Sequence, residues 1–81
     1  MDNTEERLVK VFETVFPDLT VDQIRSATQS TVSSWDSVAA ITLMNVMEEE
    51  FVVEIDFDRA AELSSFSEIL AYVKEMVTAS A

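Results

Sequence analysis

The residues with the clearest chemical potential are Asp36 and Ser37, which stand at the head of an amphipathic segment. A serine that acts as a nucleophile needs an adjacent general base and an oxyanion hole. The chain has no histidine and no "GxSxG" turn, and no motif places either of its two lysines, Lys10 and Lys74, beside this serine. We therefore expect no catalytic residues and a protein that is not an enzyme.

Two other roles remain for Ser37. Asp-Ser is favoured at helix starts for hydrogen-bonding reasons alone, so the serine can be purely structural. An exposed hydroxyl at a helix N-terminus can instead carry a phosphate ester, because free N–H groups and the helix dipole stabilise the added negative charge. In that second case a partner enzyme supplies the base.

The first half of the chain predicts one helix followed by a long loop. Apolar residues recur at helical spacing over residues 4–16, Asn3 resembles a helix start, and Pro17 ends the run. Residues 18–35 are rich in Ser, Thr, Asp and Gln, which indicates a loop with a short helical turn over residues 20–24.

The second half predicts three helices. Asp36 is a good N-cap for a helix that runs to Phe51. A short helix is expected over residues 59–63, and Ser65 with Glu68 forms a capping box for a final helix.

The connection over residues 51–57 predicts an extended loop rather than a strand. It has β character, but a single strand has nothing to pair with, so Ile55 and Phe57 are expected to pack inward. With no glycine in the chain, helices cannot end in the usual glycine left-handed caps and are expected to stop at Pro17, at polar clusters or at "VVEID". The fold prediction is all-α: a single domain over residues 1–81, a four-helix bundle with three main helices, a short third helix and a long first loop.

Charge and composition narrow the function classes. Sixteen acids against five bases give a net charge of −11, which disfavours nucleic acid and favours partners with basic surfaces. No apolar run is long enough to span a bilayer, so we expect no membrane insertion. The absence of cysteine fits a reducing cytoplasm. The expectation is a cytoplasmic monomer.

The acids do not form a recognisable metal-binding motif. Glu54, Asp56, Asp58 and Glu62 lie close together in the sequence. Binding of a hard divalent cation usually takes a DxDxDG-type loop with a glycine at its turn, and this chain has neither. Diffuse cation binding that relieves self-repulsion is expected, with no dedicated metal site.

The stretch "WDSV" followed by "AAITLMNVMEEEF" resembles the signature of acyl carrier proteins, an Asp-Ser-hydrophobic motif leading a helix that ends in acids and phenylalanine. The resemblance covers nearly the whole chain, from a first helix closed by "FP" to "EEEF" followed by "EI" and the last two helices. It implies that Ser37, with Asp36 as part of the motif, carries 4′-phosphopantetheine from coenzyme A and that acyl groups ride on this arm as thioesters. The implied partners are a phosphopantetheinyl transferase and acyl-loading and acyl-using enzymes.

We expect a free-standing, specialised member of this family, and two departures from the family pattern count against the housekeeping fatty-acid carrier. Thr42 and Asn45 stand where fatty-acid carriers commonly have an acid and an apolar residue, and Trp35 stands where they often have glycine. Fatty acid, polyketide, peptide, lipid A and rarer pathways all remain open. Trp35 either covers the base of the bundle or lies exposed beside the arm as a partner contact.

A helical projection of residues 36–51 separates two faces. One face, beside Ser37, mixes apolar residues and acids, and it is either a solvated surface or a recognition surface for basic docking partners. The residues of this face are Val38, Ile41, Asn45, Glu48, Glu49 and Val52. The opposite face supplies the core, and its adaptable side chains are candidates for an acyl pocket: Ala40, Leu43, Met44 and Met47.

An alternative of a different class also fits these patterns. An acidic helical adaptor that is never modified would bind a basic protein partner through the helix over residues 36–51, using the same exposed face. Modification of Ser37 by a phosphopantetheinyl transferase separates the two hypotheses.

Overall fold

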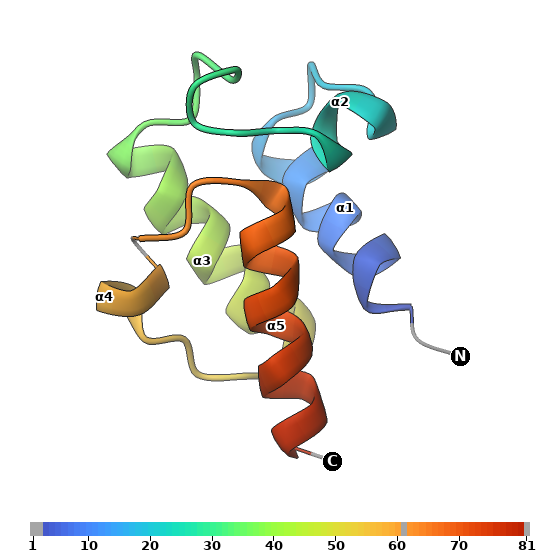
Figure 1. The fold of residues 1–81 in the computed structure, drawn as a ribbon, viewed down its shortest axis with the longest axis vertical. Helices are drawn as coiled ribbons and strands as arrows, with labels where there is room; N and C mark the ends of the chain where they lie inside the picture. Colours follow the sequence, from blue (N-terminus) through green and yellow to red (C-terminus); the bar gives the residue numbers. More distant parts are fainter. Residues whose placement is uncertain (1–2, 61, 81) are drawn as a thin grey trace.

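A computed structural model describes residues 3–60 and 62–80, and within these residues every regular element is a helix, joined by loops and without a strand. The all-α prediction is therefore confirmed (Figure 1). Five helices are present over these residues: α1 (Thr4–Val15), α2 (Val21–Arg25), α3 (Ser37–Phe51), α4 (Phe57–Ala60) and α5 (Phe66–Ser80).

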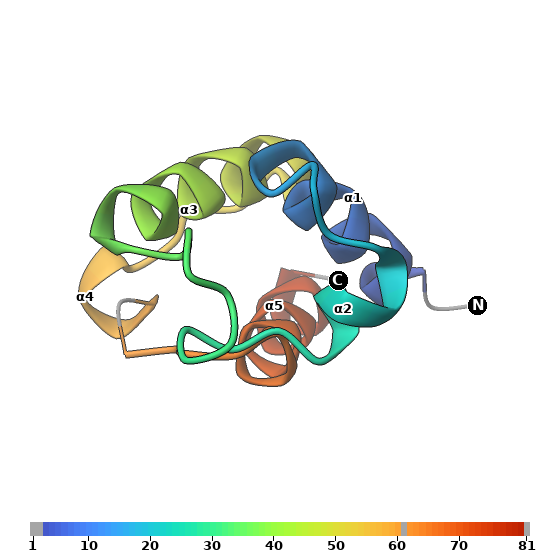
Figure 2. The same ribbon diagram turned by 90° about the horizontal axis from the view of Figure 1, so that it is seen from above.

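The three long helices α1, α3 and α5 surround the core, and the two short helices close its sides. α1 packs on both α3 and α5, α2 contacts α1 and α5, and α4 contacts α3. Seen from above, α4 lies beside the start of α3, on the side away from α1 (Figure 2). The side chains most deeply buried in this core are Leu8, Val11, Phe12, Ile24, Leu43, Met47 and Val73.

An aromatic cluster at the centre ties the long loop to the helices. The ring of Phe12 meets Trp35 edge-on at 5.5 Å between centroids and Phe66 at 5.2 Å. Phe16 lies 6.0 Å from Trp35. Edge-to-face contacts at these distances are favourable, so the loop residue immediately before Asp36 is anchored in the core. This anchoring positions the start of α3.

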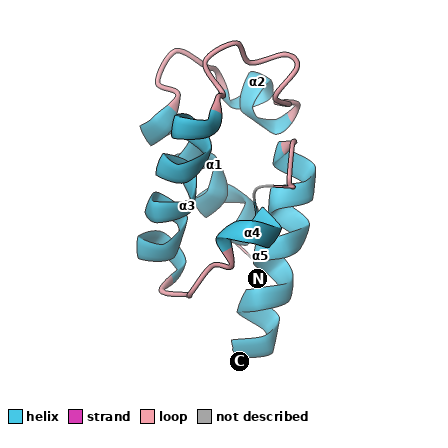
Figure 3. Ribbon diagram, turned by 90° about the vertical axis from the view of Figure 1, so that its left-hand side faces the viewer, coloured by secondary structure: helices cyan, strands magenta, loops and turns pink. Residues whose placement is uncertain are grey.

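The loop between α1 and α3 is held by α2 and by the start of α5. The predicted helical turn is the helix α2, and Thr20 and Gln23 close its capping box in both directions. Further along the loop, the Ala27 carbonyl accepts a hydrogen bond from Phe66 N–H at 3.0 Å, and Gln29 N–H donates to the Ser64 carbonyl at 2.9 Å. The loop therefore crosses one end of the molecule as an ordered strap (Figure 3).

Two predicted helix starts differ in the structure. Among the described residues, the side chain of Asn3 makes no capping hydrogen bond. Ser65 Oγ accepts from Glu68 N–H at 3.2 Å as predicted, but the Glu68 carboxylate reaches back to Ser64 instead of the Ser65 backbone. Only half of the predicted capping box forms.

The short helix α4 begins earlier than the predicted range 59–63. Asp56 Oδ1 accepts from the N–H groups of Asp58 and Arg59, which starts the helix at Phe57. Ala61, which falls within the predicted range, lies outside the described residues. Ile55 is buried as expected, but the inward packing predicted for Phe57 is wrong, because this side chain is 41% exposed.

The end of α3 falls at the start of "VVEID", as predicted. Val52 takes the left-handed conformation, with φ 54° and ψ 51°, although the chain has no glycine to favour such a cap. The N–H groups of Val52 and Val53 both donate to the Glu48 carbonyl, which compensates part of the steric cost. A β-branched residue in this conformation is strained.

We expect Val52→Gly to stabilise the protein. Relief of the left-handed strain outweighs the added flexibility of glycine in the unfolded chain, for a net gain of about 1 kcal/mol in the free energy of unfolding. Little packing is lost because Val52 is 87% exposed. Urea denaturation measures the change. Val53→Gly is the control: Val53 is half-buried and has a negative φ, so it should lose stability, and a loss at both positions would contradict the strain.

Candidate functional site

Ser37 is the first residue of α3, and its neighbour supplies the cap. Asp36 Oδ1 accepts a hydrogen bond from Ala39 N–H at 2.9 Å, and the Asp36 carbonyl accepts from Ala40 N–H at 2.9 Å. Ser37 itself is exposed. Because the aspartate performs the capping, the serine hydroxyl is not needed to start the helix.

A hollow of about 500 Å³ lies beside this serine. Three parts of the chain form its rim: Ser37 and Ile41 from α3, Gln29 from the loop, and Phe57 from α4. None of the described residues that line it is basic, and the one acid, Asp36, is engaged with Ala39 N–H. The hollow can therefore hold an extended, partly apolar group attached at Ser37.

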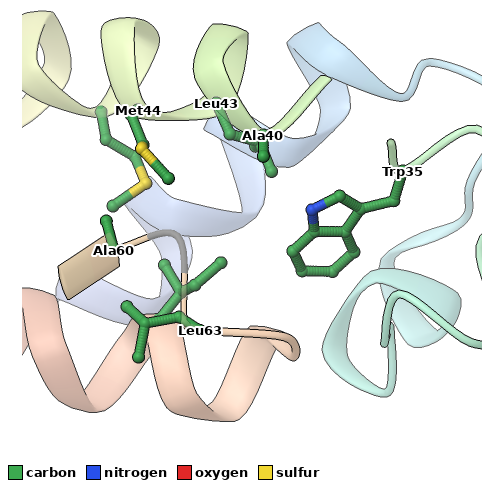
Figure 4. A pocket seen from close by; sticks show the side chains of 8 residues that line it. Trp35, Ala40, Leu43, Met44, Ala60 and Leu63 are labelled. Atoms are coloured by element: carbon green, nitrogen blue, oxygen red, sulfur yellow. The ribbon is translucent and has the colours of Figure 1, made fainter. Parts of the chain in front are cut away.

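A second, smaller cavity adjoins the hollow, since both are lined by Trp35, Ala40 and Met44, and its wall is drawn in Figure 4. Its volume is about 10 Å³, which is space for about one water molecule. The structure brings all four predicted pocket residues, Ala40, Leu43, Met44 and Met47, to its wall, and the other lining residues are Trp35, Ala60, Leu63 and Ile69. An acyl chain would have to enlarge this cavity, and the two flexible methionines in its wall suit that change.

Trp35 is common to the hollow and the cavity. Its side chain is only 5% exposed, so of the two roles left open by the sequence the structure supports the core role. Trp35 as an exposed contact for a partner enzyme is wrong, because Phe12 and Phe16 cover its ring. Its indole Nε1 is buried without a hydrogen-bond partner among the described residues.

Most of the predicted recognition residues are exposed. Val38 is 72% and Ile41 54% exposed beside the serine, and Asn45 and Glu49 follow on the outer side of α3. Val52 is also exposed but lies fifteen residues beyond Ser37, which is about 22 Å along a helix axis. A partner that docks at the serine meets Val38 and Ile41 first, and Val52 belongs to the far end of the helix.

Glu48 has a structural role that the sequence pattern did not indicate. It is half-buried, and its Oε2 accepts a hydrogen bond from Ile55 N–H at 3.0 Å. Ile55 is itself buried. The carboxylate thus holds the connection between α3 and α4 against the core, and it is less available to a partner than Glu49.

Glu48→Ala is expected to destabilise the fold more than Glu49→Ala. Removing the Glu48 carboxylate leaves the Ile55 N–H without its acceptor, at a cost of about 1 to 2 kcal/mol. The matched change at exposed Glu49 should stay within about 0.5 kcal/mol. Thermal or urea unfolding monitored by circular dichroism measures both, and equal effects at the two positions would show that the Ile55 contact contributes nothing.

Two residues of the hollow, Gln29 and Phe57, were not predicted as site residues. Gln29 comes from the middle of the loop, where no local pattern marks it. A signal did exist for Phe57: with Asp56 as the helix-starting residue, Phe57 takes the first helical position, where a side chain readily stays at the surface. It lines the same hollow as the serine because α4 lies beside the start of α3.

Other kinds of site find no support in the described residues. No group of three or more of them is arranged to hold a metal ion, and no described helix is long and apolar enough to cross a membrane.

The chain matches no family model, no curated protein and no solved structure.

Proposed function

We propose that this protein is a carrier that tethers acyl or related carboxylic intermediates as thioesters on a 4′-phosphopantetheine arm attached to Ser37. The observation that carries the proposal is the exposed serine at the first position of α3, whose cap is supplied by Asp36, beside a hollow large enough for an extended arm. The protein is a member of the acyl carrier family by this proposal, and it is not itself an enzyme.

The modification is a phosphoryl transfer that a partner enzyme catalyses. Ser37 Oγ attacks the phosphorus that bears the pantetheine of coenzyme A, a P–Oγ bond forms, and the bond to the adenosine bisphosphate leaving group breaks. The hydroxyl proton goes to a base of the transferase. The N–H groups of Ser37 and Val38, which neither capping bond uses, lie at the positive end of the α3 dipole and favour the added phosphodiester.

The hollow and the cavity together offer a route for the loaded arm. They share Trp35, Ala40 and Met44, so the cavity lies directly behind the hollow. The arm would lie between Ile41 and Phe57, and the apolar part of the cargo would reach toward the cavity. The cavity is lined almost entirely by apolar side chains, which suits the hydrocarbon part of an acyl group.

The arrangement of helices supports the same proposal at the level of the fold. α1, α3, α4 and α5 are taken as the four helices of a carrier-type bundle, in which α4 is the short third helix. α2 is then an addition within the long first loop, held by its own capping box. Ser37, at the start of α3, lies at the end of the molecule that the loop crosses.

Partners would be steered by charge and seated by apolar contacts. The net charge of −11 attracts basic docking surfaces, and exposed Val38 and Ile41 flank the serine. Such encounters are fast, weak and salt-sensitive, as a shuttle between a transferase, loading enzymes and acyl-using enzymes requires. We propose a cytoplasmic monomer for this role.

The exposure of Val38 and Ile41 equally suits an unmodified acidic adaptor that binds a basic partner through α3. Intact-protein mass spectrometry after incubation with coenzyme A and a broad-specificity transferase separates the two functions. Addition of one phosphopantetheine to the wild-type protein supports the carrier. No addition with several transferases would reject the carrier and leave the adaptor.

A further inference from the structure

The indole N–H of Trp35 points to a specific kind of cargo. It is buried, has no hydrogen-bond partner among the described residues, and faces the side of the cavity where Ala40, Leu43 and Met44 lie (Figure 4). We propose that this N–H donates a hydrogen bond to an oxygen on the chain of the cargo, so that the carrier prefers acyl groups with a keto or hydroxyl oxygen beyond the thioester. The inference rests on the proposed carrier function.

The donor has no competing use in the described structure. An indole nitrogen can only donate, so an acceptor must come to it. The ring is fixed by its contacts with Phe12 and Phe16, which prevents the N–H from turning toward solvent. Buried polar groups are normally paired, and an exception calls for an explanation. An acceptor carried in by the cargo supplies one.

The position of Trp35 places the donor on the path of the chain. Trp35 lines both the hollow at Ser37 and the cavity behind it, so a cargo that passes from one to the other passes the indole. The remaining cavity wall is made of apolar side chains. A fully saturated chain would enlarge the cavity and bring no acceptor along its hydrocarbon to the N–H, whereas a chain with a β-keto or β-hydroxyl group would pair it.

The single tryptophan of the chain makes a direct test possible. The 15N-labelled protein is loaded at Ser37 with octanoyl or with β-ketooctanoyl phosphopantetheine, and mass spectrometry verifies each loading. The Trp35 Nε1–H resonance should move downfield only with the keto chain, and its hydrogen exchange should slow about tenfold, as a new hydrogen bond of modest net strength predicts. Identical resonances with the two cargoes would overturn the proposal.

Trp35→Phe is the matched variant, since it keeps an aromatic ring in the cluster and removes only the donor and one ring. The keto chain should raise the melting temperature of the wild-type protein more than the octanoyl chain does, and this difference should vanish in Trp35→Phe. A difference that persists in the variant contradicts a role for the indole.

Failure of the carrier function has a separate signature. If mass spectrometry shows that no phosphopantetheine is added to the protein, the proposed carrier function is rejected. The donor is then tested on the unmodified protein with free methyl hexyl ketone against octane. A shift of the Nε1–H resonance with the ketone alone supports the donor role, and no shift overturns it.

Discussion

Ser37→Ala is expected to abolish the proposed phosphopantetheine transfer while the fold stays intact. The hydroxyl oxygen is the only atom that the transferase can modify at this position, so loading should fall below detection. The free energy of unfolding should change by no more than about 0.5 kcal/mol, because Asp36 caps α3 and Ser37 is exposed. Mass spectrometry measures the loading, and urea denaturation measures the stability.

Ser34→Ala is the control for this experiment. Ser34 is an exposed serine three residues earlier, and its only described role is a backbone one, because its carbonyl accepts from Asp36 N–H at 3.1 Å. Loading should be unaffected. Continued loading of Ser37→Ala would place the attachment elsewhere, and a large loss of stability in that variant would show that Ser37 is a structural residue.

Phe12→Ala is expected to remove a large share of the stability of the fold. Phe12 is completely buried, and its ring contacts Phe16, Trp35 and Phe66. Truncating such a side chain costs about 3 to 5 kcal/mol through lost burial and the cavity left behind. The whole stability of a chain of 81 residues is only about 4 to 12 kcal/mol. Circular dichroism in urea measures the loss.

Phe57→Ala provides the comparison of the same chemical change at the surface. Phe57 is partly exposed and is absent from the buried core, so its loss should cost less than about 1 kcal/mol. Trp35 fluorescence adds a local readout, since Phe12→Ala should expose the indole and shift its emission to the red. A Phe12→Ala protein with near wild-type stability would contradict the central position of this aromatic cluster.

The local features of the chain were predictable because they depend on neighbouring residues. Asp36 caps α3 as predicted, since an aspartate two or three residues ahead of a free N–H needs no distant partner. The core face of α3 was predictable as well, and Leu43, Met44 and Met47 are buried along it. A hydrophobic period of 3.6 residues marks the buried side of a helix wherever that helix packs.

The tertiary structure decided what no neighbouring residue could reveal. Trp35 is buried because Phe12 and Phe16, about twenty residues earlier, close over it. Glu48 has a structural role because the segment after α3 folds back and brings Ile55 N–H within hydrogen-bonding distance of the Glu48 carboxylate. In both cases the outcome depends on which distant groups arrive at the same place.

The sequence by itself therefore determined the helices, the inner face of α3 and the position of Ser37 at its start. Only the tertiary structure decided that Phe57 borders the hollow at this serine and that the four predicted pocket residues meet at one cavity. The physical reason is the range of the interactions: caps and periodicity act within one or two turns of helix, whereas burial and cavities form between segments that are far apart in the chain.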